Sequence, residues 1–162
     1  MPGEDSRLVE ITLDEHSVVR RSPEIEHERA AAIADLLKEN RFAPVSGRIG
    51  PFRLHLAIAE NRLNLDIRSA ADGGGETILL PLAPFRGIVK DYFMVCESYY
   101  AATRRAGLAQ IEALDVGRRS LHDEGSALLR DRLADRVAID HATARRLFTL
   151  ICVLHLRGVG AG

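Results

Sequence analysis

Two runs of alternating apolar and polar residues lie next to each other in the middle of the chain, at 52–59 and 62–68. A repeat of two residues is typical of strands that bury one face. The Glu60–Asn61 pair between the runs has the length of a tight hairpin turn. With that turn, Ile58 lies opposite Leu63, and the apolar residues of both runs share one face. The sequence therefore predicts an antiparallel hairpin whose register is set by its turn.

The segments around this hairpin predict a sheet followed by helices. Pro23 fits the first turn of a helix that Ser22 can cap, and Gly107 separates two later helices. In chain order the predicted elements are a strand at 8–13, a helix at 23–40, strands at 52–59, 62–68 and 78–82, helices at 85–103 and 111–129, a short strand at 137–139 and a helix at 141–158.

This order of elements predicts an α+β fold, in which a small antiparallel sheet has helices packed on one face and the C-terminal half is helical. Its 162 residues are enough to bury a real core. The sequence contains no visible linker or internal repeat. We therefore expect a single domain over residues 1–162, with frayed tails at 1–6 and 159–162.

The two helices on either side of Gly107 are predicted to run antiparallel and to pack against each other. Glycine inside a helix costs about 1 kcal/mol relative to alanine, so Gly117 and Gly125 require a packing reason. We expect that each admits a bulky side chain and that alanine at either position destabilises the protein. The predicted facing pairs are Tyr92 with Leu121, Cys96 with Gly117 and Ile88 with Gly125.

A polar strip beside this helix contact is the best candidate for a binding site. Its cations, together with the Ser126 hydroxyl, could hold a phosphate or a carboxylate. The alternative is a solvated face, on which Asp115, Arg119 and Asp123 form an ion-pair ladder. The candidate anion-binding residues are Lys90, Arg118, Arg119 and His122.

Composition and motifs exclude several classes of protein. The formal net charge of −1 implies no obligatory polyanion partner. The longest apolar stretch, Leu147–Leu156, is too short for a membrane span, and the charged N-terminus lacks the apolar segment of a signal peptide. We find no phosphate-binding loop, dinucleotide fingerprint, HExxH or GxSxG motif. We therefore expect a soluble cytoplasmic protein that needs no cofactor.

Cysteine and histidine give only a weak indication of metal binding. Cys152 and His155 share a face of the last helix, and Cys96 could approach them from another helix. Structural zinc sites have paired cysteine spacings that this chain lacks. Free cysteine is usually a small buried apolar residue. We therefore predict no metal site.

Four longer phrases carry a resemblance to a known family. They are RRSPEIEHER at 20–29, PFRGIVKDYFMVCESYY at 84–100, GRRSLHDEG at 117–125 and RRLFTLICVLHLRG at 145–158. In these phrases the chain resembles a small uncharacterised family of alphaproteobacterial proteins, one of the UPF class, over about residues 8–158. The resemblance implies a cytoplasmic bacterial protein, and it implies no activity and no catalytic residue.

Three hypotheses for function follow from these residues. The first is a non-enzymatic binding or protein-interaction protein, because no nucleophile, base and oxyanion arrangement is visible. The second is an enzyme for a small anionic substrate, with His122 as the only plausible proton carrier near pH 7. The third is RNA binding by Arg53, Arg62 and Arg68 on the polar face of the hairpin, which interleaves no aromatic residue. The expected partner is an unknown protein or a small anionic ligand. We expect no membrane binding, nucleic acid is an unlikely partner, and a homo-oligomer is possible.

Overall fold

The computed structural model describes residues 5–14, 23–105 and 107–161, with side chains in the last helix as far as Leu154. Ser22, the predicted helix cap, lies outside the described residues, as does the side chain of His155. The elements in chain order are β1 (Leu8–Leu13), α1 (Pro23–Lys38), β2 (Phe42–Pro44), β3 (Phe52–Ala59), β4 (Arg62–Ser69), β5 (Gly75–Pro81), the 3-10 helix η2 (Ala83–Phe85), α2 (Arg86–Arg105), α3 (Leu108–Leu133), β6 (Val137–Ile139) and α4 (His141–Ala161).

The larger sheet has the strand order β1-β3-β4-β5, and its central hairpin has the predicted register. Ile58 pairs with Leu63, and the turn residues Glu60 and Asn61 have φ values of 54° and 61°. Two consecutive left-handed residues are what a two-residue hairpin turn requires, because their twist matches that of the strands. Only β1 departs from the antiparallel pattern, since it pairs parallel to β3.

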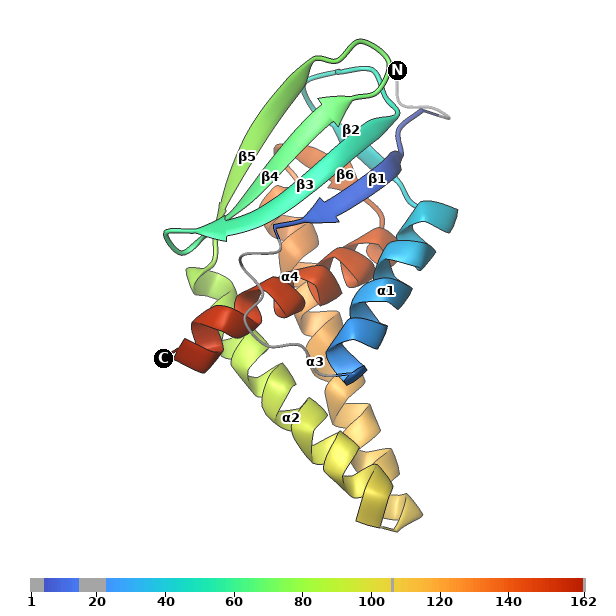
Figure 1. Ribbon diagram of the computed structural model, residues 1–162, viewed down its shortest axis with the longest axis vertical. Helices are drawn as coiled ribbons and strands as arrows, with labels where there is room; N and C mark the ends of the chain where they lie inside the picture. The colour runs from blue at the N-terminus through green and yellow to red at the C-terminus, as the bar shows by residue number, and fades with distance from the viewer. Residues whose placement is uncertain (1–4, 15–22, 106, 162) are drawn as a thin grey trace.

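The helices cover one face of this sheet, and α4 runs directly beneath the strands (Figure 1). Alternate side chains of β3 and β4, such as Leu54, Leu56 and Leu65, are buried against them. The described part of the chain thus has the predicted α+β fold with a helical C-terminal half. A second sheet of two strands pairs β2 with β6. Strand β6 was predicted from the sequence, whereas β2 was not, because its three residues are too few for a periodic signal.

The contact between α2 and α3 differs in detail from the prediction. The helical segment breaks at Gly107 as predicted, and the ring of Tyr92 on α2 packs against the ring of His122 on α3. Gly125 faces the ring of Phe148 on α4, and Ile88 is not among its nearest neighbours. The pairs predicted for the two glycines were wrong. The atom nearest to a methyl group at Gly117 belongs to Val95 and not to Cys96, and α4 takes the face of Gly125 that was assigned to α2.

Asn40, just after α1, connects the helical layer to the edge of the sheet. Its side-chain oxygen accepts the N–H of Leu8 at 2.7 Å, and its amide nitrogen donates to the carbonyl of Leu8 at 3.0 Å. The same nitrogen donates to the carbonyl of Leu36 at 2.6 Å, near the end of α1. One amide side chain therefore satisfies the backbone of an edge strand and a free carbonyl at a helix end.

Candidate functional site

A groove of about 490 Å³ lies between α1, α3 and α4. Its floor contains the buried rings of Tyr92 and His122. The groove is open where helices carry small side chains, namely Ala31 on α1 and Ala142 on α4. Volumes of this size are typical of sites for small ligands.

Two arginines of α3 line one side of the groove, and both pair with Asp115. Arg118 Nη2 lies 2.6 Å from an oxygen of that carboxylate, and Arg119 Nε lies 3.2 Å from the other. The Arg118 hydrogen bond holds the pKa of Asp115 below its usual range. Arg118 also lies over the ring of Tyr99, with its central carbon 4.3 Å from the ring centroid. These contacts hold the Arg118 guanidinium in place, which lowers the entropy cost of binding an anion.

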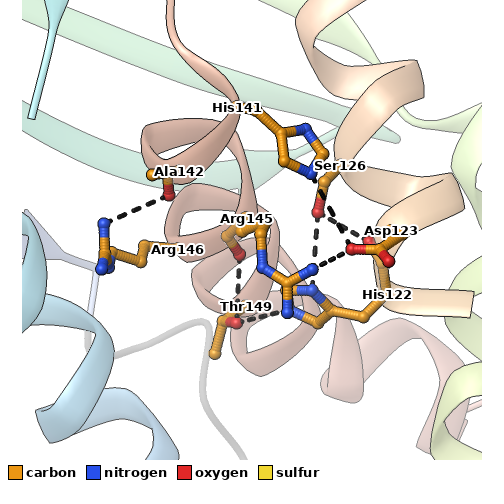
Figure 2. Close-up of polar contacts among 8 residues, drawn as sticks. All are labelled: His122, Asp123, Ser126, His141, Ala142, Arg145, Arg146 and Thr149. Atoms are coloured by element: carbon orange, nitrogen blue, oxygen red, sulfur yellow. Dashed lines mark hydrogen bonds and ion pairs between the residues drawn. The ribbon is translucent and has the colours of Figure 1, made fainter. Parts of the chain in front are cut away.

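Two arginines of α4 line the adjoining side, and each has a carboxylate partner. Arg145 pairs with Asp123 of α3, as Figure 2 shows. Arg146 lies 3.9 Å from Asp35 of α1. A guanidinium has five N–H donors, so one carboxylate leaves several of them available for a ligand.

His122 lies beneath these arginines and is only 9% exposed. Its Nε2 is hydrogen-bonded to the hydroxyl of Thr149 at 2.8 Å (Figure 2). Its ring also packs against the rings of Tyr92 and Phe148. Burial, together with the charges of Arg145, Arg118 and His141, lowers the pKa of His122 to about 4. The imidazole is therefore neutral at physiological pH and is a weak base there.

Ser126 carries a second hydroxyl group near the ring of His122. Its Oγ lies 3.5 Å from His122 Nδ1, but it donates to the carbonyl of His122 at 2.6 Å and is fully buried. A serine that donates to the carbonyl four residues earlier uses its proton within its own helix. This pair is therefore part of the core packing of α3, below the surface of the groove.

The α1 side of the groove carries the carboxylates. Glu28 and Asp35 are two turns apart on α1, with Ala31 and Ala32 between them. Glu28 is half-buried and accepts a hydrogen bond from the hydroxyl of Tyr100 at 2.7 Å. Burial, and then that hydrogen bond, raise the pKa of Tyr100. The groove therefore has guanidinium groups from α3 and α4 and carboxylates from α1.

The structure brings together three of the four predicted site residues. Arg118, Arg119 and His122 line the groove, whereas Lys90 is exposed on α2 and does not line it. Lys90 follows the buried Val89 by one position, and one residue turns a helix by about 100°. His122 was predicted on the polar strip, but it lies in the core below it.

Two arginines of the groove, Arg145 and Arg146, were not predicted from the sequence. They lie in the first turns of α4, before its apolar residues begin. The adjacent Arg-Arg pair that interrupts the pattern was the available signal. The predicted charge ladder is half present, because Arg119 pairs with Asp115 while Asp123 pairs with Arg145.

The arginines considered for RNA binding lie elsewhere. Arg53, Arg62 and Arg68 are exposed on the sheet strands β3 and β4, and Arg53 stands opposite Arg68 in the register. Arg68 Nε lies 3.3 Å from Asp66, which neutralises part of this surface.

The two cysteines are buried and free. Burial raises the pKa of the Cys96 thiol to about 11, and it raises that of Cys152 as well. Such thiols are poor nucleophiles and poor metal ligands. Within the part of the chain that the structure describes, no three His, Cys, Asp or Glu side chains are grouped as metal ligands would be. The side chain of His155, the third residue considered as a ligand, lies outside that part.

None of the described helices combines the length and the apolar character that a membrane crossing requires.

Fold and groove together define an α+β protein with a charged interhelical groove. The chain belongs to the uncharacterised protein family UPF0262, whose model matches residues 5–157. The resemblance seen in the sequence phrases is thereby confirmed.

Curated relatives in alphaproteobacteria match along nearly the whole chain. A UPF0262 protein of Rhodospirillum rubrum is 61% identical over 93% of this chain and 93% of its own. One from Rhodopseudomonas palustris is 57% identical over 95% of this chain and 94% of its own. One from Bradyrhizobium is 56% identical over 98% of this chain and 96% of its own. No solved structure matches this chain.

Proposed function

We propose that this protein is a non-enzymatic binding protein of the bacterial cytoplasm that holds a small ligand by an anionic group in the groove. The observation that carries this proposal is the placement of four arginines, two from α3 and two from α4, around one groove of about 490 Å³. Arginine recognises carboxylate and phosphate through paired N–H donors, which gives both affinity and orientation.

The arrangement of the arginines favours binding over a structural role alone. Asp115 and Asp123 pair with arginines of the groove but do not themselves line it. They therefore hold the guanidinium groups and leave donors free on the groove side. Charged side chains that are held before the ligand arrives lose less entropy when it binds.

The chemistry of the floor supports binding without catalysis. His122, the residue considered as a proton carrier, has a pKa of about 4 and is therefore poorly matched to proton transfer near neutral pH. The hydroxyl of Ser126 is buried and donates to the backbone. The groove thus offers hydrogen-bond donors for an anion, whereas the hydroxyl of Ser126 is out of reach of a ligand in the groove.

A thermal-shift screen of phosphate- and carboxylate-bearing metabolites tests this proposal. A ligand present at 100 times its dissociation constant stabilises the native state by about 2.7 kcal/mol. We expect at least one such compound to raise the melting temperature of the wild type, and Arg145→Gln to remove the effect. Arg104→Gln is the matched control, because Arg104 pairs with Glu24 and does not line the groove.

Two results would contradict the proposal. If no anionic compound stabilises the protein, or if Arg145→Gln responds as the wild type does, the groove is not an anion site. Mass spectrometry of the bound compound after incubation tests the non-enzymatic part. Recovery of the compound unchanged is expected, and its conversion to a product would favour an enzyme instead.

A further inference from the structure

Positive and negative side chains line different sides of the groove. All four guanidinium groups that line it come from α3 and α4, and both carboxylates, Glu28 and Asp35, come from α1. A ligand with only negative charge would complement two walls and would be repelled by the third. A ligand that carries both signs of charge would complement all three.

Among the residues that the structure describes, Glu28 is a groove carboxylate with no ion-pair partner. Its one hydrogen bond is to the neutral hydroxyl of Tyr100, and the structure places no cation within ion-pair distance of it among the residues described. Asp35, by contrast, pairs with Arg146. The charge of Glu28 also contributes to the raised pKa of the buried Cys96, so it acts close to the core. A half-buried charge of this kind is costly unless something pairs with it.

Arg118, on the α3 side of the groove, has a guanidinium donor without a partner. Its Nη2 donates to Asp115, but its Nε is buried and has no hydrogen-bond partner in the structure. Buried donors in native proteins are nearly always satisfied, by protein or by ordered water, so an acceptor beside this guanidinium is favoured. A cationic donor would pair with Glu28, and an anionic acceptor would pair with Arg118.

We propose that the groove binds a zwitterion of the amino-acid class, with its carboxylate on Arg118 and its ammonium on Glu28. This inference rests on the proposed function and names its ligand class. Ala31 and Ala142 leave room beside these two anchors for the ligand's side chain. A site whose buried groups pair with both ends of a ligand discriminates strongly against analogues that lack either end.

Calorimetry with matched ligands tests the inference. The common amino acids are first screened by thermal shift, and the most stabilising one is compared with its analogues without the amino group and without the carboxylate. Charge-assisted hydrogen bonds contribute enough that we expect either analogue to bind roughly tenfold more weakly, or worse.

Variants of Glu28 and Arg118 then test which residue binds which end of the ligand. Glu28→Gln should weaken the amino acid roughly tenfold and leave the affinity for the deaminated analogue unchanged, whereas Arg118→Gln should weaken both. Glu24→Gln is the matched control, because Glu24 lies one turn earlier on α1, pairs with Arg104 and does not line the groove. It should bind like the wild type.

The outcomes separate this inference from the proposed function. If deaminated acids or inorganic phosphate bind as tightly as amino acids, and Glu28→Gln changes nothing, the zwitterion is wrong and the anion site remains. If amino acids, deaminated acids and phosphate all fail to bind to the wild type, both proposals are overturned.

Discussion

At Gly125 the packing leaves no room for one more carbon atom. A methyl group there would overlap the ring of Phe148, which is fully buried and also contacts Tyr92 and His122. Gly117 is different, because the nearest atom to a methyl group would be Val95 Cγ1 at 3.9 Å, an ordinary contact. The two glycines of α3 therefore have opposite consequences for stability.

We expect Gly125→Ala to lower the free energy of unfolding and Gly117→Ala to raise it. Overpacking costs about 1–3 kcal/mol, which exceeds the gain in helix propensity at position 125. At position 117 the gain of up to about 1 kcal/mol meets no such penalty. Urea denaturation of both variants measures the difference. A rise in the midpoint for both would show that Phe148 does not press on α3.

The β3–β4 hairpin is the element whose conformation is most demanding locally. Glu60 and Asn61 both have positive φ, and glutamate is a poor residue for that region. Asn61 has a further role, because its side-chain oxygen accepts a hydrogen bond from Arg86 at 2.5 Å. The turn thus contains one residue suited to its backbone and one that is not.

Glu60→Asn should therefore stabilise the protein. Asparagine is favoured in the left-handed region, and we expect a gain of about 0.5–1 kcal/mol in the free energy of unfolding. The side chain of Glu60 is exposed, so little else changes. Equilibrium denaturation in urea is the measurement, with Glu112→Asn on the exposed face of α3 as a control that should not gain stability. A loss at position 60 would contradict the turn assigned to this hairpin.

Elements whose pairing is local were predictable from the sequence, and those set by distant segments were not. The register of β3 and β4 followed from period-two alternation and a two-residue turn. The face of α3 that meets Phe148 depends on α4, which comes later in the chain. The groove shows the same limit, since Arg118 and His122 were found on one helix, whereas Arg145 joins them only through tertiary packing. The residues next to Glu28 in the sequence could not indicate that it has no ion-pair partner among the described residues.

At the scale of the molecule, the sheet and the helices meet at Asn40. The backbone of Leu8 lies at the edge of the sheet and is almost fully buried, so its N–H and C=O require partners. Asn40 supplies both partners and also binds the carbonyl of Leu36 in α1. The position of α1, which forms one wall of the groove, is thus tied to the first strand.

Asn40→Ala should destabilise the whole protein. It leaves buried backbone groups of Leu8 unsatisfied, and we expect a loss of about 1–3 kcal/mol in the free energy of unfolding. Asn40→Asp is the informative comparison, because it keeps the acceptor for the Leu8 N–H and loses both donors. Hydrogen exchange at the Leu8 amide should accelerate in the alanine variant and stay slow in the aspartate variant. Unchanged exchange in both would show that Asn40 does not hold β1.

The parallel pairing of β1 with β3 also sets an order of events during synthesis. Leu8 pairs with Phe52, so β1 leaves the ribosome roughly forty residues before its partner, which at about 5–20 residues per second is a wait of several seconds. The β3–β4–β5 meander can close as soon as it emerges, because its strands are joined by short turns. β2 waits longer still, since it pairs with β6 near the end of the chain. The segments made first are therefore docked late, and their apolar side chains need protection from aggregation until the helices arrive.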